Sequence, residues 1–486
     1  MQALPNSAAV AASTGPQGRL PATALIVVGQ VGPAEAAAAP DPLWQAALPP
    51  ARRVLAIGAE AMALVAAHRA AHPTAAWWGL CLPGDDAARL HAAPHALQAL
   101  LSLDEVERTD DNLAPAEIDL IVLSPAWAAL PDASRRLAAW SAGCTADAQL
   151  LMAFDNAAAV PRLTALLQAD DTPLPGAGPA GPALVPASVY KLLMDAGWMP
   201  GLQAHLPCEA PPAKTARSLR FAAEAVGVAT GIVDVVHHLQ RLVVQARRRL
   251  VQAPVLPGAA RFSVVVPTTE ETQLRRNVEA SPGLREVQAD IVSVRGARNP
   301  ADALAQARPH CHTDWVLLCH QDVYFAAGFG EQLNAVLAEV PAEARSRTVI
   351  GFIGMGVDRQ RHQPVPAGHV IDRLNCADHP ASDAVLSIDE LALVVSRDSL
   401  HHIDPELGWH LWATGLCLAA IEQHRVFPRI VRLPLFHNSR TGSTLPPAFI
   451  ASAQVLLRKF PAFAPIHTLC GTLDASFVAR HTQAAA

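Results

Sequence analysis

Short apolar runs alternate with longer segments of helical pattern in the first part of the chain. Each run has apolar residues at successive positions, so both faces of the corresponding strand would be buried. The segments between the runs are long enough for the crossover helices that parallel strands require. The runs begin at Ala24, Arg53, Ala76, Ile118 and Ala148. This pattern predicts an α/β domain with a parallel sheet over residues 23–210.

The last part of the chain shows the same alternation and predicts a second α/β domain over residues 259–475. Its apolar runs begin at Phe262, Ile291, Trp315, Thr348 and Leu391. Residues 211–258 contain no strand or turn signals after their start, which predicts a helical connector. Residues 1–22 are small, polar and punctuated by Pro and Gly, so we expect a disordered lead there. Residues 476–486 are expected to form a tail.

Composition and charge narrow the range of functions. The chain has 486 residues, of which 51% are hydrophobic, and a net charge of -6. This charge offers no electrostatic basis for nucleic acid as a partner. The eight cysteines show no zinc-like spacing and indicate free thiols in a reducing cytoplasm. Neither a signal peptide nor an apolar stretch long enough to cross a membrane is evident, so we expect a cytoplasmic protein.

The end of the predicted connector is basic and amphipathic. It contains Arg241, Arg247, Arg248 and Arg249. As a helix, this segment could contact anionic lipid headgroups at the inner face of the cell membrane. A solvated face of an interdomain helix is the alternative that we favour, because such charged faces are common. The sequence leaves a peripheral membrane contact open.

Polar residues follow three apolar runs of the second domain. Pro267, Thr268 and Glu270 come at the end of the first run, Asp322 follows W-V-L-L-C-H-Q, and His437 ends a later run. Open α/β sheets bind ligands outside the carboxyl ends of their strands. An acid at the tip of a buried strand is costly without a partner, and a divalent cation is one such partner. The alternatives are a turn-capping Asp322 and a structural His437.

In this order, these segments resemble the family 2 glycosyltransferases, in particular a bacterial branch with H-Q-D-V where relatives have D-x-D. The resemblance extends from about Arg261 to Gly471. Its landmarks are S-V-V-V-P-T, G-A-R-N-P-A-D-A-L, H-Q-D-V-Y-F, I-D-E, D-P-E-L-G-W-H and F-H-N-S. The resemblance implies a fold of the GT-A type, with a mixed central sheet and a nucleotide-sugar site at its strand ends.

The resemblance also implies roles for individual residues. Asp322 and His437 would hold Mn²⁺ or Mg²⁺ on the diphosphate of a UDP-, GDP- or dTDP-sugar. An acceptor hydroxyl would then attack the anomeric carbon, with inversion, while the metal stabilises the departing nucleoside diphosphate. The implied nucleotide-sugar site consists of Pro267, Thr268, Glu270, Arg298, Asn299, His320 and Asp322.

The general base is where this chain departs from the family pattern. Gly415 stands where relatives carry the Asp that is expected to act as the base, and glycine cannot accept a proton. Asp389, Glu390 and His410 are the nearby substitutes. The two acids could instead bind the acceptor sugar.

The first domain resembles the S-adenosylmethionine-dependent methyltransferases. The matching segments are R-R-V-L-A-I-G-A-E, W-W-G-L-C-L-P-G-D-D, A-E-I-D-L-I-V-L-S-P-A-W and L-M-D-A-G-W-M-P. They imply a Rossmann-like fold, with S-adenosylmethionine near Gly58, Glu60 and Asp85. Glu60 occupies a position where the family has glycine, so we favour a degenerate domain with a structural or docking role.

Taken together, the sequence predicts a cytoplasmic, metal-dependent and inverting glycosyltransferase. Its acceptor would be a cell-surface glycan, a lipid-linked sugar or a protein. One alternative is a non-catalytic protein that binds nucleotide sugars or acts as a scaffold. Another is a bifunctional enzyme that transfers both sugars and methyl groups.

Overall fold

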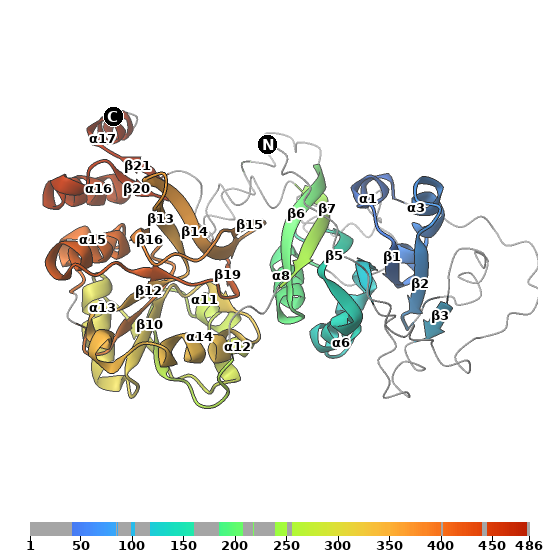
Figure 1. The fold of residues 1–486 in the computed structure, drawn as a ribbon, viewed down its shortest axis with the longest axis horizontal. Coiled ribbons are helices and arrows are strands. Elements are labelled where there is room, and N and C mark those ends of the chain that lie inside the picture. The colour runs from blue at the N-terminus through green and yellow to red at the C-terminus, as the bar shows by residue number, and fades with distance from the viewer. Residues whose placement is uncertain are drawn as a thin grey trace, which may run out of the picture.

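The computed structural model describes residues 41–83, 85, 99–102, 117–159, 184–207, 217, 239–249, 255–399, 402–439 and 445–483. These residues form an α/β protein with mixed sheets, arranged as two domains (Figure 1). The expected lead at residues 1–22 and the apolar run at Ala24 lie outside the described residues. None of the helices in the described part is long and apolar enough to cross a membrane.

The N-terminal domain is built on one seven-stranded sheet with the order β3-β2-β1-β4-β5-β7-β6. Its neighbouring strands are parallel, except that β7 is antiparallel to both β5 and β6. Because β1 lies beside β4, the order of strands reverses there, and open α/β sheets commonly have their ligand crevice at the carboxyl ends of such strands. The strands are β1 (Arg53–Ile57), β2 (Ala76–Cys81), β3 (Ala99–Ser102), β4 (Ile118–Leu123), β5 (Cys144–Asp155), β6 (Trp198–Pro207) and β7 (Leu239–Arg248).

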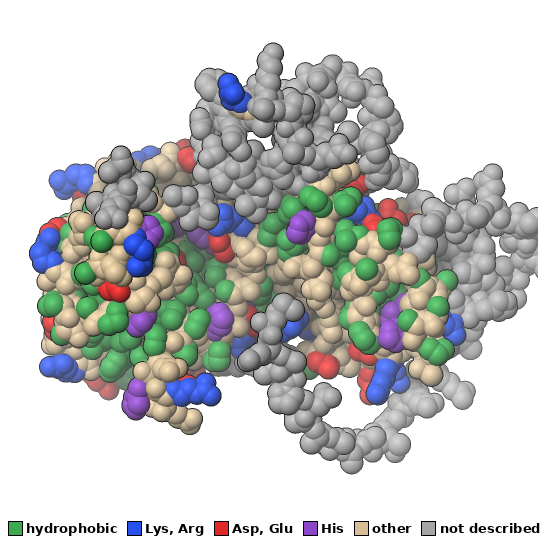
Figure 2. Space-filling model, turned by 90° about the horizontal axis from the view of Figure 1, so that it is seen from above, with side chains coloured by type: hydrophobic (Ala, Val, Ile, Leu, Met, Phe, Trp, Pro, Cys, Tyr) green, Lys and Arg blue, Asp and Glu red, His purple; other side chains and the backbone are tan. Residues whose placement is uncertain are grey.

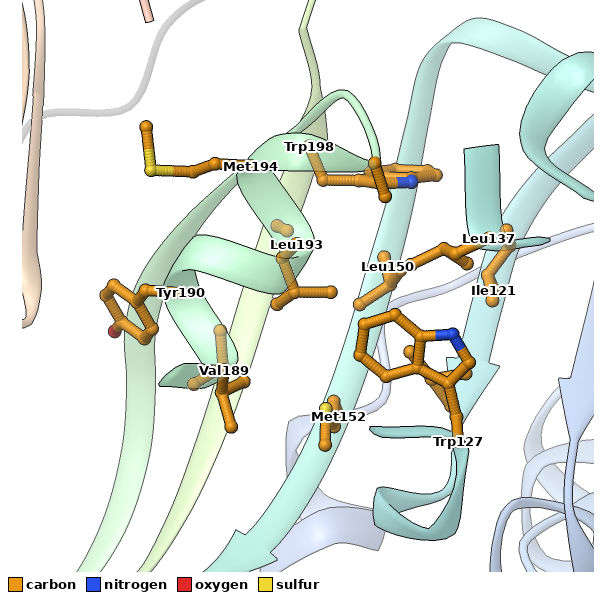
Figure 3. Packing of buried hydrophobic residues seen from close by; sticks show 14 of the residues in the cluster. Ile121, Trp127, Leu137, Leu150, Met152, Val189, Tyr190, Leu193, Met194 and Trp198 are labelled. Carbon is orange, nitrogen blue, oxygen red and sulfur yellow. The ribbon is translucent and has the colours of Figure 1, made fainter. Parts of the chain in front are cut away.

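Both faces of this sheet are buried, as the apolar runs predict. Leu55 and Ile57 of β1 belong to one core, whereas Val54 and Ala56 of the same strand belong to another. Helix α8 packs on the first core, where Tyr190, Leu193 and Trp198 are buried (Figure 3). The described helices are α1 (Pro42–Ala47), α2 (Ala59–Met62), α3 (Val65–Ala71), α6 (Ala133–Trp140) and α8 (Pro186–Asp195).

The predicted helical connector is wrong over its basic end. Residues Leu239–Arg248 form strand β7, which inserts between β5 and β6 in the N-terminal sheet. Its successive residues Leu242 and Val243 are buried in different cores, on opposite faces of the sheet, and a short apolar run of this kind fits a central strand as well as a helix. Arg241 pairs with Asp155, and Arg248 donates to the carbonyl of Cys144. The amphipathic basic helix proposed for lipid contact is therefore absent from this segment.

The C-terminal domain contains two six-stranded sheets and a hairpin among its described residues. The central sheet has the order β18-β12-β17-β10-β8-β9, and the second has β11-β19-β14-β13-β16, with β15 paired to β14. The central strands are β8 (Phe262–Thr268), β9 (Ile291–Arg295), β10 (Trp315–Cys319), β12 (Val349–Gly351), β17 (Ala392–Ser396) and β18 (Arg429–Ile430). The others are β11 (Val323–Phe325), β13 (Ile353–Asp358), β14 (Gln363–Asp372), β15 (Asn375–Asp378), β16 (Val385–Ile388), β19 (Leu435–His437), β20 (Ile466–Thr468) and β21 (Gly471–Leu473).

Helices cover both faces of the central sheet. One core includes residues of α13, α15 and α16, and the other includes residues of α11, α12 and α14. The helices are α11 (Glu271–Arg276), α12 (Pro282–Arg285), α13 (Pro300–Ala307), α14 (Phe329–Ala338), α15 (Trp412–His424), α16 (Pro447–Lys459) and α17 (Ala475–Gln483). The predicted tail at residues 476–486 is thus largely helix α17, whose Phe477 is buried against Phe449.

The two domains share an apolar core. The cluster on the α8 face of the N-terminal sheet continues into Tyr324, Ile371, Leu374 and Phe436 of the C-terminal domain. Strand β6 lies beside β15 across the boundary (Figure 1). The domains are therefore joined by packing as well as by the covalent chain.

On the molecular face in Figure 2, the Lys and Arg side chains are scattered and do not gather into one patch.

The packing of α17 predicts a stability effect. Substitution of Phe477 by Ala would leave a cavity beside Phe449 and lower the free energy of unfolding by about 3 kcal/mol. Substitution of the neighbouring Arg480 by Ala, on the exposed side of the helix, would change it by less than about 0.5 kcal/mol. Chemical denaturation monitored by tryptophan fluorescence measures both effects. Equal stability of the two variants would show that residues 475–483 behave as a tail.

Candidate functional site

The central sheet of the C-terminal domain reverses its strand order at β8, the kind of position where open α/β sheets form a ligand crevice. Strand β8 lies between β9 and β10 and is parallel to both. The chain therefore passes from β8 to β9 on one side of β8, and the next strand, β10, lies on the other side. The carboxyl ends of β8 and β10 therefore meet at one edge, where open sheets bind ligands. Thr268 ends β8, and His320 and Asp322 follow β10.

Three donor groups converge beside this crevice. The ligand atoms of His320, Asp322 and His437 all lie within 4.8 Å of one another. His437 Nε2 is 3.5 Å from Asp322 Oδ1, and the ring centroids of His320 and His437 are 5.7 Å apart. The structure thus brings together Asp322 and His437, as expected from the sequence. It adds His320 as a third donor, which we had assigned to the nucleotide-sugar site alone.

Backbone pairing between distant segments builds this cluster. His320 N donates to the carbonyl of Leu391, and Asn438 N donates to the carbonyl of Asp322. Strands β11 and β19 are antiparallel, with Val323 opposite His437. The loop after β10 is therefore held on both sides, and the two short strands that follow Asp322 and end in His437 keep these side chains in register.

Asp372 is a site residue that the sequence analysis missed. It ends β14, which runs parallel to β19 and places Asp372 opposite His437. Asp372 Oδ1 is 3.1 Å from His437 Nδ1. This contact directs His437 Nε2 toward Asp322, an arrangement that metal-binding histidines commonly use. The available signal was an acid at the end of an apolar run, the same signal that identified Asp322.

The cluster is arranged to hold one positive charge. Burial lowers the pKa of His437, but Asp322 and Asp372 outweigh it and raise that pKa to about 10. Burial raises the pKa of Asp322, but the His437 imidazolium outweighs it and brings that pKa below its usual range. Burial also lowers the pKa of His320, which favours the neutral imidazole that metals require. A divalent cation and the proton on His437 Nε2, the nitrogen that faces Asp322, would therefore compete for the same nitrogen.

The candidate base residues lie next to this cluster. Asp389 and Glu390 occupy the turn between β16 and β17, directly before Leu391, whose carbonyl binds His320 N. Glu390 Oε1 accepts a hydrogen bond from Leu411 N at 3.0 Å. Burial, followed by the charge of Asp389, raises the pKa of Glu390 to about 8. Glu390 therefore anchors the loop that follows His410, while burial lowers the pKa of His410.

Gly415 is closed off by packing. It lies in helix α15, and a Cβ atom at this position would be only 2.4 Å from Leu407 Cδ1. An acidic side chain could not fit here unless Leu407 moved. The position at which the family resemblance places the base is therefore filled by an apolar neighbour in this chain.

The expected nucleotide-sugar residues lie along the same sheet edge, but several use their side chains locally. Thr268 Oγ1 donates to the carbonyl of Val266, and Asn299 caps α13 by accepting from Asp302 N. Pro267 lies within β8, and the turn that follows, with Glu270, is tied to the β10 loop by a residue that the sequence analysis did not select. This residue is Gln321, whose Oε1 accepts from Thr269 N and Glu270 N at 2.8 and 2.9 Å. Arg298 pairs with Asp302 and is largely exposed.

The crevice of the N-terminal domain also brings its predicted residues together. Gly58 has φ +87°, and a Cβ atom there would lie 2.5 Å from Ser124 Cβ on the neighbouring strand end. Asp85 Oδ2 accepts from Leu82 N at 2.7 Å. Burial raises the pKa of Glu60, while Arg241 lowers it. Here Gly58 permits close packing of β1 against Ser124, which is a structural reason for glycine.

Comparisons with known proteins give only distant similarity. No family model matches the chain, and no curated protein matches it. Part of the chain is similar to the Rossmann-like fold of solved methyltransferases. The mitomycin 7-O-methyltransferase MmcR is 16% identical, with a TM-score of 0.25, over 42% of this chain and 52% of that one. This chain therefore spans about half the length of that protein.

Two further solved structures match at the same level. An S-adenosylmethionine-dependent methyltransferase from Mesorhizobium loti is 15% identical, with a TM-score of 0.25, over 43% of this chain and 96% of its own. The plantazolicin methyltransferase BpumL is 12% identical, with a TM-score of 0.25, over 42% and 80%. Similarity at this level concerns fold and carries no conclusion about activity.

The charge of the cluster predicts how metal binding depends on pH. Because His437 holds a proton below its raised pKa of about 10, each Mn²⁺ ion that binds must displace one proton. Between roughly pH 6 and pH 8, the Mn²⁺ dissociation constant should fall about tenfold per pH unit. Titration calorimetry in buffers of different ionisation enthalpy counts the released proton. A dissociation constant that stays level over this range would contradict the competition.

Proposed function

We propose that the C-terminal domain is a Mn²⁺-dependent, inverting glycosyltransferase that uses a nucleoside-diphospho-sugar donor. The observation that carries this proposal is the convergence of His320, Asp322 and His437 at a sheet edge where ligands bind. Two imidazoles and a carboxylate suit Mn²⁺ better than Mg²⁺, which prefers oxygen ligands. When bound, the ion would neutralise charge on the departing nucleoside diphosphate.

The residues of the chain would divide the remaining work. His320, Asp322 and His437 would hold the ion, and Asp372 would keep the His437 ring turned toward it. Gln321 shapes the turn after β8 by accepting from Thr269 N and Glu270 N, and the Glu270 side chain of this turn would meet the nucleotide. The loops at this edge would orient the donor and keep water from the anomeric carbon.

Asp389 is our candidate for the base that accepts the proton of the acceptor hydroxyl. It lies in the turn beside His320, and one of its oxygens accepts from Leu391 N at 3.1 Å. Glu390 is less suited, because burial and the charge of Asp389 raise its pKa to about 8, so that its carboxyl group is largely protonated near neutral pH. His410 lies against Phe449 and would contact the acceptor from the facing loop. The acceptor would be a glycan, a lipid-linked sugar or a protein of the cell surface.

A donor panel tests this proposal. The full chain, with Mn²⁺ and UDP-, GDP- or dTDP-sugars, should release nucleoside diphosphate from at least one donor. Asp322→Asn and His437→Ala should each reduce kcat/KM by about 100-fold or more, because both remove a charge-stabilising contact. Asp389→Asn should reduce kcat with little change in KM.

Asp314→Asn is a matched control for these variants. Asp314 precedes β10, whereas Asp322 follows it, so the two acids lie at opposite ends of the same strand. Asp314 pairs with Arg345 near the surface, and its substitution should leave turnover within about twofold. Donor binding without turnover would instead support a non-catalytic nucleotide-sugar-binding protein, which the filled Gly415 position favours. A chain that neither binds a nucleotide-sugar donor nor releases nucleoside diphosphate from one would refute the proposal.

The N-terminal crevice gives a bifunctional enzyme as the second candidate. The close approach of Gly58 to Ser124 preserves a cofactor-type turn after β1. We nevertheless propose a structural role for this domain, because the exposed Glu60 side chain lies close enough to Asp85 to interact with it and would meet the cofactor. Calorimetry with S-adenosylmethionine decides between them. Micromolar binding that Glu60→Gln alters would overturn the purely structural role and favour a bifunctional enzyme, and this substitution avoids the packing clash expected at Gly58.

A further inference from the structure

We infer that helix α8 of the N-terminal domain positions the strands next to the proposed metal ligands. The N-terminal, methyltransferase-like domain would thus stabilise the metal site of the C-terminal domain. This inference rests on the proposed metal site. It identifies Tyr190 and Asp195 as positioning residues, because neither touches the donor atoms and each binds a strand that presents them.

The first contact reaches the strand that follows Asp322. Asp195, at the end of α8, accepts from Tyr324 Oη at 2.6 Å and from Ala327 N at 3.2 Å. Tyr324 lies on β11, two residues after Asp322. Strand β11 has only three residues, so few ladder hydrogen bonds fix its place. The two bonds to Asp195 therefore add substantially to what holds this strand.

The second contact reaches the strands of Asp372 and His437. Tyr190, fully buried on α8, donates to the carbonyl of Leu374 at 3.1 Å. Leu374 comes two residues after Asp372. The Tyr190 ring also lies 6.3 Å, between centroids, from Phe436, the residue before His437. One side chain of α8 thus contacts both segments whose ends meet in the Asp372–His437 pair.

Lys191 completes the contact surface of α8. Its Nζ donates to Asn277 Oδ1 at 2.8 Å and lies 4.6 Å from the centre of the Tyr324 ring. Asn438, next to His437, in turn donates to Asn277 Oδ1 at 3.4 Å. Two successive residues of the helix therefore reach both neighbours of His437 in the chain: Tyr190 contacts Phe436, and Lys191 connects through Asn277 to Asn438.

The arrangement has a physical consequence for metal affinity. Metal ligands must be held to within a fraction of an ångström, and groups that orient ligands commonly alter metal affinity by about 10-fold to 100-fold. Strands β11 and β19 have only three residues each, and side chains of α8 in the other domain contact both of them: Asp195 binds Tyr324, and Tyr190 lies beside Phe436. Loss of the α8 contacts should therefore loosen Asp322 and His437 without unfolding either sheet.

The experiment uses the full chain and variants of the contact residues. Asp195→Ala should weaken Mn²⁺ binding about tenfold, as measured by the electron paramagnetic resonance signal of free Mn²⁺. Asp195→Asn, which retains an accepting oxygen, should recover part of this loss. Tyr190→Phe removes only the hydroxyl and should weaken binding severalfold while the fold is preserved.

Ser134→Ala is the matched control. Ser134 Oγ donates to the carbonyl of Leu192, so it joins α6 to α8 within the N-terminal domain and does not cross the boundary. Its substitution removes one hydrogen bond of α8, as Tyr190→Phe does, and should leave Mn²⁺ affinity within about twofold. If Ser134→Ala weakens Mn²⁺ binding as much as Asp195→Ala, general destabilisation explains the effect and the inference is wrong.

Hydrogen exchange separates failure of this positioning role from failure of the proposed function. In metal-free protein, Asp195→Ala should speed amide exchange in β11 and β19 at least fivefold, with β8 and β1 unchanged. Unchanged exchange in β11 and β19 would overturn the inference, whatever the metal result. Faster exchange in a chain that binds no Mn²⁺ would support positioning of these strands while refuting the proposed metal site.

Discussion

His437 lies between Asp322 and Asp372, and these three side chains come from β19, the loop after β10 and the end of β14. Asp322 and Asp372 are partly buried and contact different nitrogens of the His437 ring, and a partly desolvated carboxylate is costly without a positive partner. A proton on His437 satisfies this requirement, and a divalent ion held by Asp322, His437 and His320 would satisfy it more fully. The pairing of β11 and β14 with β19 brings these groups together and so determines what the site can do.

The N-terminal domain contributes a framework on which this pairing depends. Its sheet keeps both faces buried and a crevice at the β1–β4 reversal, yet its apolar core extends into Tyr324, Leu374 and Phe436. A domain whose own crevice is lined by mutually interacting acids can still supply a rigid surface to a neighbour. Shared cores of this kind make the relative position of two domains as specific as packing within one domain.

Local pattern was sufficient to predict much of this architecture. The apolar runs at Arg53, Ala76, Phe262 and Trp315 became strands of parallel pairs, because burial on both faces requires apolar residues at successive positions. The position of Asp322 at a strand end, and of His437 after another apolar run, was also visible in the sequence. These features depend only on near neighbours along the chain, which explains why sequence reasoning could find them.

Contacts between distant segments decided the rest. Leu239–Arg248 has a helical pattern and basic residues, but it forms a strand because it pairs with both β5 and β6. Asp372 became part of the site only because β14 runs parallel to β19, and Gly415 was closed only because Leu407 packs against it. The sequence by itself determined the strands with continuous apolar runs and the positions of Asp322 and His437 next to such runs. The tertiary structure decided which ends meet, because strand pairing is set by side-chain packing across the whole domain and not by the residues of one strand.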